Sequence, residues 1–349
     1  MKDIFGGCKK LKNINISSFN TKNVTNMSGM FRNCKNLLNI DLSKLDTSKT
    51  IDMSKMFENC KSLTELNLSL FNTKNVTNMN YMFNECVNLK NIIFSNFSTK
   101  NVIKMEGMFM ECQKLEDLNL ISFNTLNVIT MEKMFCGCIN LDNINLSSFY
   151  THNVRNFSSM FENCTNLKAI SLSRFNTQNA TDMSSMFSNC INLKSLDLSK
   201  FKIGNVEKIS KMFFNCKRLA KLNLKSFEKN KIIDMTSMFH GCESLTELNL
   251  SSFHTNYASS MEQMFYGCVN LSNLNIDSFE IDKYTGIRNI FYGCLNLTDI
   301  IIKNLKDKID KKDKKEHQNN YLYIDFLFIM IIMIIMIMII RLIINSLIK

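Results

Sequence analysis

The sequence contains no proline and no tryptophan among its 349 residues, and only four histidines. Proline lacks a backbone N–H and would remove a donor from a hydrogen-bonded ladder, so its absence suits a chain committed to regular backbone pairing. His152, His240, His254 and His317 have no metal-ligand spacing. The motifs G-x-S-x-G and H-E-x-x-H and a phosphate-binding loop are also missing. These absences favour a non-enzymatic protein with no cofactor and no metal.

Cysteine, by contrast, recurs every 26 residues, twelve times, from Cys8 to Cys294. A phenylalanine stands three residues before each of these cysteines and a leucine three residues after it. A fixed period of this length is typical of a stack of identical units, a solenoid. We expect these three residues to form buried ladders. In three successive copies they are Phe31, Cys34 and Leu37; Phe57, Cys60 and Leu63; and Phe83, Cys86 and Leu89.

Each repeat has two halves with different apolar spacing. After the cysteine, the pattern L-x-x-L-x-L alternates as in a half-buried strand, and it predicts strands at 39–43 and 65–69. In the second half, apolar residues three or four apart predict a short helix from Met79 to Asn84, with Thr77 or Asn78 as its N-cap. Asn or Gly before most of the cysteines fits a left-handed helix exit, although Glu85 and Glu111 depart from this.

The expected fold is therefore an α/β solenoid. We expect a leucine-rich-repeat-like, right-handed coil of about twelve 26-residue repeats, each a short parallel strand plus a short helix. At about 4.8 Å per strand, twelve strands would form a continuous sheet roughly 50 Å long.

The thirteen cysteines invite a zinc or disulfide interpretation. Zinc sites need clustered pairs, and the only close pair is Cys136 and Cys138. Because the cysteine spacing equals the structural period, buried free thiols are the favoured interpretation, with occasional disulfides between neighbouring coils left open. Cys136 lies outside the series, and we expect it to be a surface thiol at a helix exit.

The motif F-N-T-x-N-V-T-x-M-x-x-M-F-x-x-C, seen at Phe19–Cys34 and again at Phe71–Cys86, resembles the BspA-like leucine-rich repeat surface proteins. The resemblance covers residues 1 to about 305. It implies display at a cell surface, adhesion, and contact with host or matrix proteins. The matching residues are structural, so the resemblance implies no catalytic residue.

The exposed strand positions predict a polar, concave face. At the seventh residue after each cysteine, Asn and Asp predominate, and the candidate binding residues there are Asn67, Ile93, Asn119, Asn145, Asp197, Asn223 and Asn249. One interpretation is an Asn and Ser ladder bonding between coils, or plain solvation. The other is a groove that binds a protein or carbohydrate, since solenoids present extended surfaces. Ile93 is an aliphatic outlier that could anchor a partner.

The net charge of +11 comes from 42 Lys and Arg against 31 Asp and Glu. Along the repeats this charge forms no basic stripe with interleaved aromatics, so we expect no nucleic-acid partner.

The C-terminal region breaks the repeat. We divide the chain into a solenoid at 1–305, a charged linker at 306–320 and a transmembrane anchor with a short tail at 321–349. Residues 326–340 are uninterrupted apolar residues, and with their flanks they reach a membrane-spanning length of about 20 residues. Seven lysines at 303–315 would place the solenoid in the cytoplasm by the positive-inside rule, whereas the family resemblance places it outside.

Two functions follow from these features. The first is a membrane-anchored solenoid that binds proteins or glycans at the cell surface. The alternative is a tail-anchored intracellular scaffold for protein–protein interaction. No signal peptide is visible at the N-terminus, which begins inside a repeat, and a shortened chain would explain that.

Overall fold

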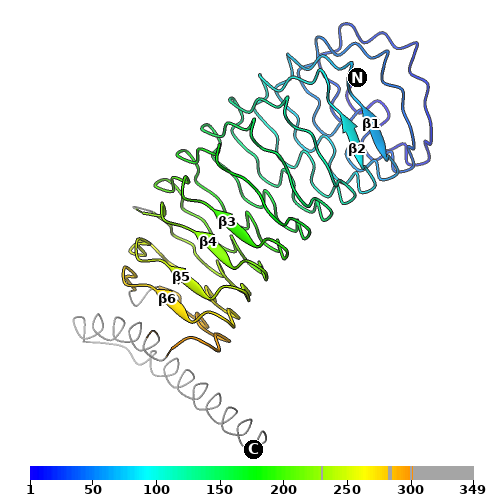
Figure 1. Cartoon of the computed structure of the whole chain (residues 1–349). Helices are drawn as coiled ribbons and strands as arrows, with labels where there is room; N and C mark the ends of the chain where they lie inside the picture. Colours follow the sequence, from blue (N-terminus) through cyan, green and yellow to red (C-terminus); the bar gives the residue numbers. More distant parts are fainter. Residues whose placement is uncertain (229–230, 282–284, 299–300, 302–349) are drawn as a thin grey trace, which may run out of the picture. The chain divides into compact units, whose positions relative to one another are not determined.

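The computed structural model describes residues 1–228, 231–281, 285–298 and 301 (Figure 1). The chain divides into two units, Met1–Ile302 and Lys303–Lys349. The predicted linker and the predicted anchor lie outside the described residues, so both stay predictions. Within the described ranges, no helix has the length and apolar character needed to cross a membrane.

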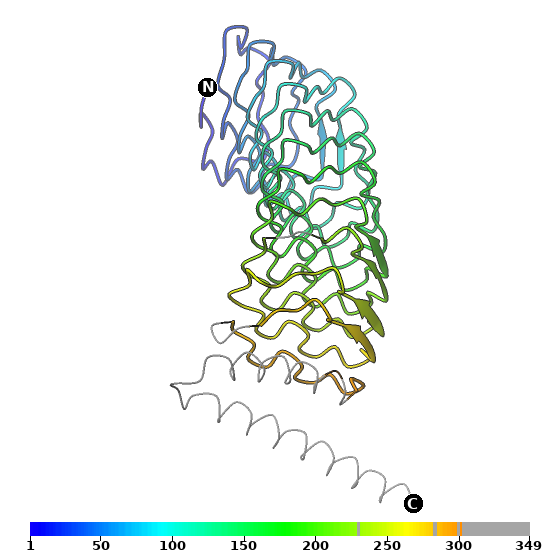
Figure 2. The ribbon, with the colours of Figure 1, turned by 90° about the vertical axis from the view of Figure 1, so that its left-hand side faces the viewer.

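The first unit is a solenoid of stacked coils. We call the 26 residues from one cysteine of the series to the residue before the next a coil, and name it by its cysteine. Strands lie along one side of the stack, as Figures 1 and 2 show, and they pair in parallel with partners 26 residues away, such as Leu66 with Ile92. The pairs are β1 (Glu65–Asn67) with β2 (Asn91–Ile93), β3 (Ser195–Asp197) with β4 (Lys221–Asn223), and β5 (Glu247–Asn249) with β6 (Asn273–Asn275).

The strand predictions are partly right. A strand at 65–69 is confirmed over Glu65–Asn67, but 39–43 forms none, and the continuous twelve-strand sheet is wrong. Each strand ends after three residues because the chain turns there. In β1, the side-chain oxygen of Asn67 accepts the backbone N–H of Ser69 at 3.0 Å, which withdraws that N–H from the sheet.

Continuous pairing between coils occurs on another side of the coil. The eighteenth residue after a cysteine of the series forms a parallel bridge with its counterpart 26 residues later, beginning with Asn26 to Asp52 and ending with Ser260 to Gly286. Each of Asn26, Asp52 and Asn78 also accepts the N–H of the second residue after it. The Asn78 oxygen therefore makes a local hydrogen bond that closes a turn, but the predicted N-cap is wrong because no helix follows it.

The predicted helix at Met79–Asn84 is wrong, and within the described residues no repeat contains one in this half. In a helix, each N–H after the first turn would donate to the carbonyl four residues earlier in the same segment. Here alternate N–H groups leave the coil. The N–H groups of Met79, Tyr81, Phe83 and Glu85 donate to the carbonyls of Lys104, Glu106, Met108 and Met110 at 2.7–3.0 Å.

The remaining N–H groups close tight turns within the coil. Met82, Asn84 and Cys86 donate to the carbonyls three residues earlier, on Met79, Tyr81 and Phe83, at 3.1–3.2 Å. Successive turns, each closed by a hydrogen bond between residues three apart, give the Met, Met, Phe and Cys side chains the same spacing that a short helix would give. The sequence pattern is therefore the same for a helix and for successive turns. The hydrogen bonds to the next coil are what favour the turns.

These turns need left-handed backbone at two places in each coil. The residue before each cysteine has positive φ, as predicted, at Asn59 (59°) and Gly137 (75°). Glu85 (58°) and Glu111 (57°) have it too, so the expected exception at glutamate is wrong. The second place, four residues earlier, was not anticipated, and Tyr81 there has a φ of 56°. Left-handed backbone is unfavourable for side chains other than glycine, so the between-coil hydrogen bonds must hold these residues in place.

The phenylalanine ladder runs through the whole described stack. Phe5, Phe31 and each following ladder phenylalanine to Phe291 stack with ring centroids 5.5–6.0 Å apart. Phe31, Phe57 and Phe83 are 0% exposed, as are Leu37, Leu63 and Leu89. Offset stacking of this kind adds to the hydrophobic gain of burying each ring. One coil alone would expose these rings, so each coil depends on its neighbours for its core.

A buried threonine column also links the coils, at the thirteenth residue after the cysteine. The Thr99 hydroxyl donates to the carbonyl of Asn124 at 2.8 Å and accepts the N–H of the same residue at 2.7 Å. Thr47, Thr73, Thr125, Thr151, Thr177 and Thr255 bond to the next coil in the same way. Each buried threonine hydroxyl thus satisfies both backbone groups of one residue on the next coil.

Substituting Thr99 with valine tests this column. Valine keeps the shape but removes the hydroxyl, so the N–H and carbonyl of Asn124 lose their partner, and we expect a loss of about 1–3 kcal/mol in unfolding free energy. The measurement is the urea midpoint followed by circular dichroism. Thr181→Val is the control, because the exposed Thr181 hydroxyl makes one bond of 3.3 Å to the carbonyl of Arg155. Equal shifts in the two variants would contradict a role for the column.

Candidate binding face

The candidate binding residues lie in one row on the strand side of the solenoid. We call the exposed side chains from the fourth to the tenth residue after each cysteine the strand face. Register brings Asn67 beside Ile93, Asp197 beside Asn223, and Asn249 beside Asn275. Asn119 and Asn145 occupy the same position in the coils between. All seven candidate side chains are exposed.

The side-chain oxygens of this row are already engaged within their own coils. Asn145, Asp197 and Asn249 accept the N–H of the serine two residues later at 2.9–3.0 Å. Asn119 and Asn223 accept from Ile121 and Lys225 in the same way. The same contacts to Ser199 lower the pKa of Asp197. These bonds run within a coil. Asp197 also accepts a side-chain hydrogen bond from Asn223 of the next coil, so bonding between coils occurs at this pair but does not form a continuous Asn and Ser ladder along these residues.

Three strongly exposed aliphatic side chains lie on the strand face of three successive coils, and Leu38, 45% exposed, lies on the strand face of the coil before them. Ile93 is 49% exposed, as its position suggested, but Leu70 at 63% and Ile121 at 69% are exposed further. Leu70 is the tenth residue after Cys60, Ile93 is the seventh after Cys86, and Ile121 is the ninth after Cys112. We call these three residues the aliphatic cluster. The sequence pattern at the seventh position reveals Ile93 but not Leu70 or Ile121, which occupy other positions of the strand face.

The cysteine series is buried and chemically quiet. Cys34, Cys60 and Cys86 are 0% exposed, like each later member as far as Cys268. Each donates its S–H to the carbonyl of the phenylalanine 29 residues earlier, as Cys86 Sγ does to Phe57 O at 3.0 Å. The same Phe57 carbonyl also accepts the N–H of Cys60. Burial raises the pKa of Cys86 and of Cys216 to about 12. All thirteen thiols are free.

Cys136 does not lie where the sequence suggested. It is 6% exposed, so the expectation of a surface thiol is wrong. With no helix to end there, its backbone is part of the turn, and its carbonyl accepts the N–H of Glu111 from the preceding coil at 2.7 Å. Burial raises the pKa of its thiol to about 12, which removes it as a candidate nucleophile.

The same position, two residues before the cysteine, carries a column of aromatic side chains in the last coils. Phe214, His240, Tyr266 and Tyr292 stack with centroids 4.5–4.8 Å apart. Burial lowers the pKa of His240, which favours its neutral form. The sequence showed only that the histidines lack metal-ligand spacing, and this stack gives His240 a structural place in the repeat. In the part of the chain that the structure describes, no three His, Cys, Asp or Glu side chains come together as a metal site.

The solenoid matches a known protein family along its length. Residues 1–117, 87–197 and 181–305 match the family described as "Mycoplasma protein of unknown function, DUF285". The chain belongs to this family. DUF285 membership supplies no activity, and the resemblance to the BspA-like family stays a prediction. No curated protein matches the chain.

Solved leucine-rich repeat proteins are similar at low identity. One from Bacteroides ovatus is 19% identical, with 85% of this chain and 80% of that chain covered and a TM-score of 0.40. A leucine-rich cell surface protein from Faecalibacterium prausnitzii is 17% identical, with 75% and 78% covered and a TM-score of 0.35. One from Eubacterium ventriosum is 15% identical, with 75% and 78% covered and a TM-score of 0.41.

Thiol alkylation tests the burial of the cysteine series. The thiolate is the reactive species, so raised pKa values and burial together should protect these thiols from iodoacetamide at pH 8. Cys8 is exposed, and we expect it alone to be labelled in the folded chain, with all thirteen labelled after denaturation. Mass spectrometry of the digested protein locates the label. Rapid labelling of Cys136 or of any member from Cys34 to Cys268 would show that the coils do not pack as described.

Proposed function

We propose that this DUF285 protein is a non-enzymatic binding protein that is displayed at a cell surface. Its strand face would contact a protein or carbohydrate, and residues 321–349 would anchor it in the membrane. The observation that carries the proposal is the aliphatic cluster on a mostly polar face. Leu70 and Ile121 are the most exposed of the large hydrophobic side chains in the described residues.

A partner that covers the aliphatic cluster would gain binding free energy by removing these side chains from water. Burying one fully exposed aliphatic side chain is worth about 1.5–3 kcal/mol. The cluster lies on three successive coils, which sit about 4.8 Å apart, so one partner could cover all three residues. The polar rim around it resembles the arrangement of binding patches in which an apolar centre is surrounded by hydrogen-bonding groups. A partner would use the side-chain amide hydrogens of Asn67, Asn119 and Asn145, since the oxygens of these side chains are engaged.

Membrane display is supported by the apolar run at 326–340 and by the family resemblance. The second candidate, a tail-anchored intracellular scaffold, is supported by the seven lysines at 303–315 and by the free thiols. Both candidates use the same strand face, and they differ in which side of the membrane the solenoid occupies.

Protease treatment of intact cells distinguishes the two candidates. Surface display predicts that trypsin removes the solenoid without lysis, because lysines are exposed on many coils, and that a membrane-impermeant amine reagent labels Lys22 and Lys74 in intact cells. A cytoplasmic marker protein that stays intact controls for lysis. If the solenoid survives and is labelled only after permeabilisation, surface display is wrong and the scaffold proposal replaces it.

A further inference from the structure

Cations gather on the strand face of three successive coils. The Cys164, Cys190 and Cys216 coils place six exposed basic side chains there, with Asp197 as the one acid among them. We call these six residues the basic cluster: Lys168, Arg174, Lys194, Lys200, Lys221 and Lys225. The net charge of the whole chain gave no sign of this local concentration.

The coils on both sides of the cluster have the opposite sign. Before it, the strand face carries Glu116, Asp117 and Asp142, with no cation on those two coils. After it, the strand face carries Glu247 and Asp277, again with no cation. The basic cluster is therefore a bounded patch three coils wide, rather than part of a uniformly basic surface.

Register places like charges on neighbouring coils. Lys194 lies one coil after Lys168, whose carbonyl accepts its N–H at 3.4 Å, and Lys200 occupies the position equivalent to Arg174. Like charges on adjacent strands destabilise a sheet. Lys168 has one ion pair, to Asp142 Oδ2 at 3.2 Å, and both side chains are exposed, so it contributes little. The other five form no ion pair among the described residues.

A shallow depression lies inside the cluster. It has a volume of about 360 Å³ and is lined by Leu196, Leu222 and Lys221 together with the carboxylates of Asp197 and Glu247. Ala220 also lines it, at the position where the two preceding coils carry Lys168 and Lys194. The small alanine side chain leaves room that a lysine would fill. The six cations, five of them without an ion pair among the described residues, form an exposed positive surface that is suited to an extended anionic ligand.

We propose that the basic cluster binds an acidic polysaccharide. The strand face of these coils has no aromatic side chain, and binding of single-stranded nucleic acid relies on aromatic stacking. Protein hot spots favour Trp, Tyr and Arg, of which only Arg174 is present. Between the cations, Ser171, Ser173 and Asn223 offer polar groups for sugar hydroxyls. The inference rests on the proposed function, because it names the ligand class for the same strand face.

Heparin, as a sulfated polysaccharide, is the probe. We expect the full chain in mild detergent to bind heparin at 0.15 M salt, and the variant K194Q/K200Q/K221Q/K225Q to lose about tenfold or more in affinity with a shallower salt dependence, because four cations no longer release counterions. Surface plasmon resonance over a range of salt concentrations measures both quantities. Circular dichroism checks that the variant is folded.

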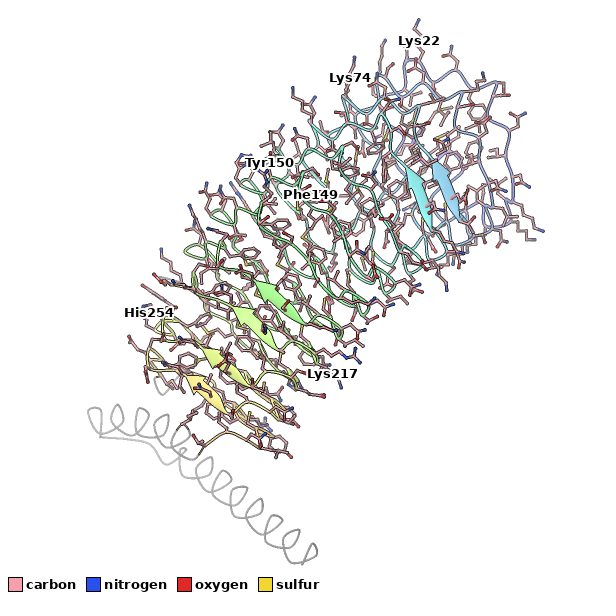
Figure 3. All side chains as sticks on the ribbon, viewed as in Figure 1. Lys22, Lys74, Phe149, Tyr150, Lys217 and His254 are labelled. Carbon is pink, nitrogen blue, oxygen red and sulfur yellow. The ribbon has the colours of Figure 1, made fainter. Side chains whose placement is uncertain are left out.

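The matched control removes the same charge elsewhere. K22Q/K49Q/K74Q/K100Q changes four exposed lysines at the fourteenth and fifteenth residue after the cysteine, and Figure 3 shows Lys22 and Lys74 on the edge away from Lys217. We expect its affinity for heparin to stay within about twofold. An equal loss in the control variant, or no loss in the cluster variant, would overturn the proposal.

Two further probes test the class of ligand. Polyglutamate represents an acidic peptide and oligothymidylate represents single-stranded nucleic acid, each at the same total charge as the heparin used. Weaker binding of both supports the polysaccharide, and binding of either one as tight as heparin overturns it. Protease treatment of intact cells tests the proposed surface display independently of these binding measurements. If the solenoid is displayed but the cluster variant binds heparin normally, only this inference fails.

Discussion

Every second backbone N–H of the turn segment donates to the coil that follows, and the rest of the solenoid depends on this exchange. Met79, Tyr81, Phe83 and Glu85 donate forward, while the N–H groups between them close turns within the coil. The hydrogen bonds between coils and those within a coil can all form only if equivalent residues of successive coils are always the same number of residues apart. A constant 26-residue period is thus a hydrogen-bonding requirement before it is a packing one. The phenylalanine stack, the threonine column and the buried thiols all follow from that register.

The sequence alone was sufficient for the parts of the fold that follow from periodicity, namely the stacked coils and the buried Phe, Cys and Leu ladders. It was insufficient where a local pattern has two solutions. Met79, Met82, Phe83 and Cys86 have helical spacing, yet the same spacing arises from successive turns whose N–H groups need a neighbour. Left-handed backbone at Tyr81 and Glu85 is equally invisible, because neither residue type favours it. On the strand face, Ile93 was recognisable, whereas the aliphatic and basic clusters appear only when several coils are viewed together.

Structure and function therefore occupy different positions of the same repeat. The inward positions are almost invariant from coil to coil, and a change there breaks a continuous ladder. The strand face is free to vary, and its variation is not scattered. Three coils carry the aliphatic cluster, and three later coils carry the basic cluster, which is bordered by acids. A solenoid of this kind can acquire a binding surface by local substitution without disturbing the hydrogen bonds that hold the stack.

Deletion of one whole coil tests the register most directly. Removing Cys112–Gly137 joins Glu111 to Cys138, keeps the spacing of every ladder and brings Phe109 beside Phe161. The account predicts that this variant unfolds in urea as cooperatively as the parent chain, with a small change of midpoint. Removing half a coil, Cys112–Asn124, breaks the register and should abolish the transition. If the whole-coil deletion unfolds as poorly as the half-coil deletion, the coils are not interchangeable units and the account is wrong.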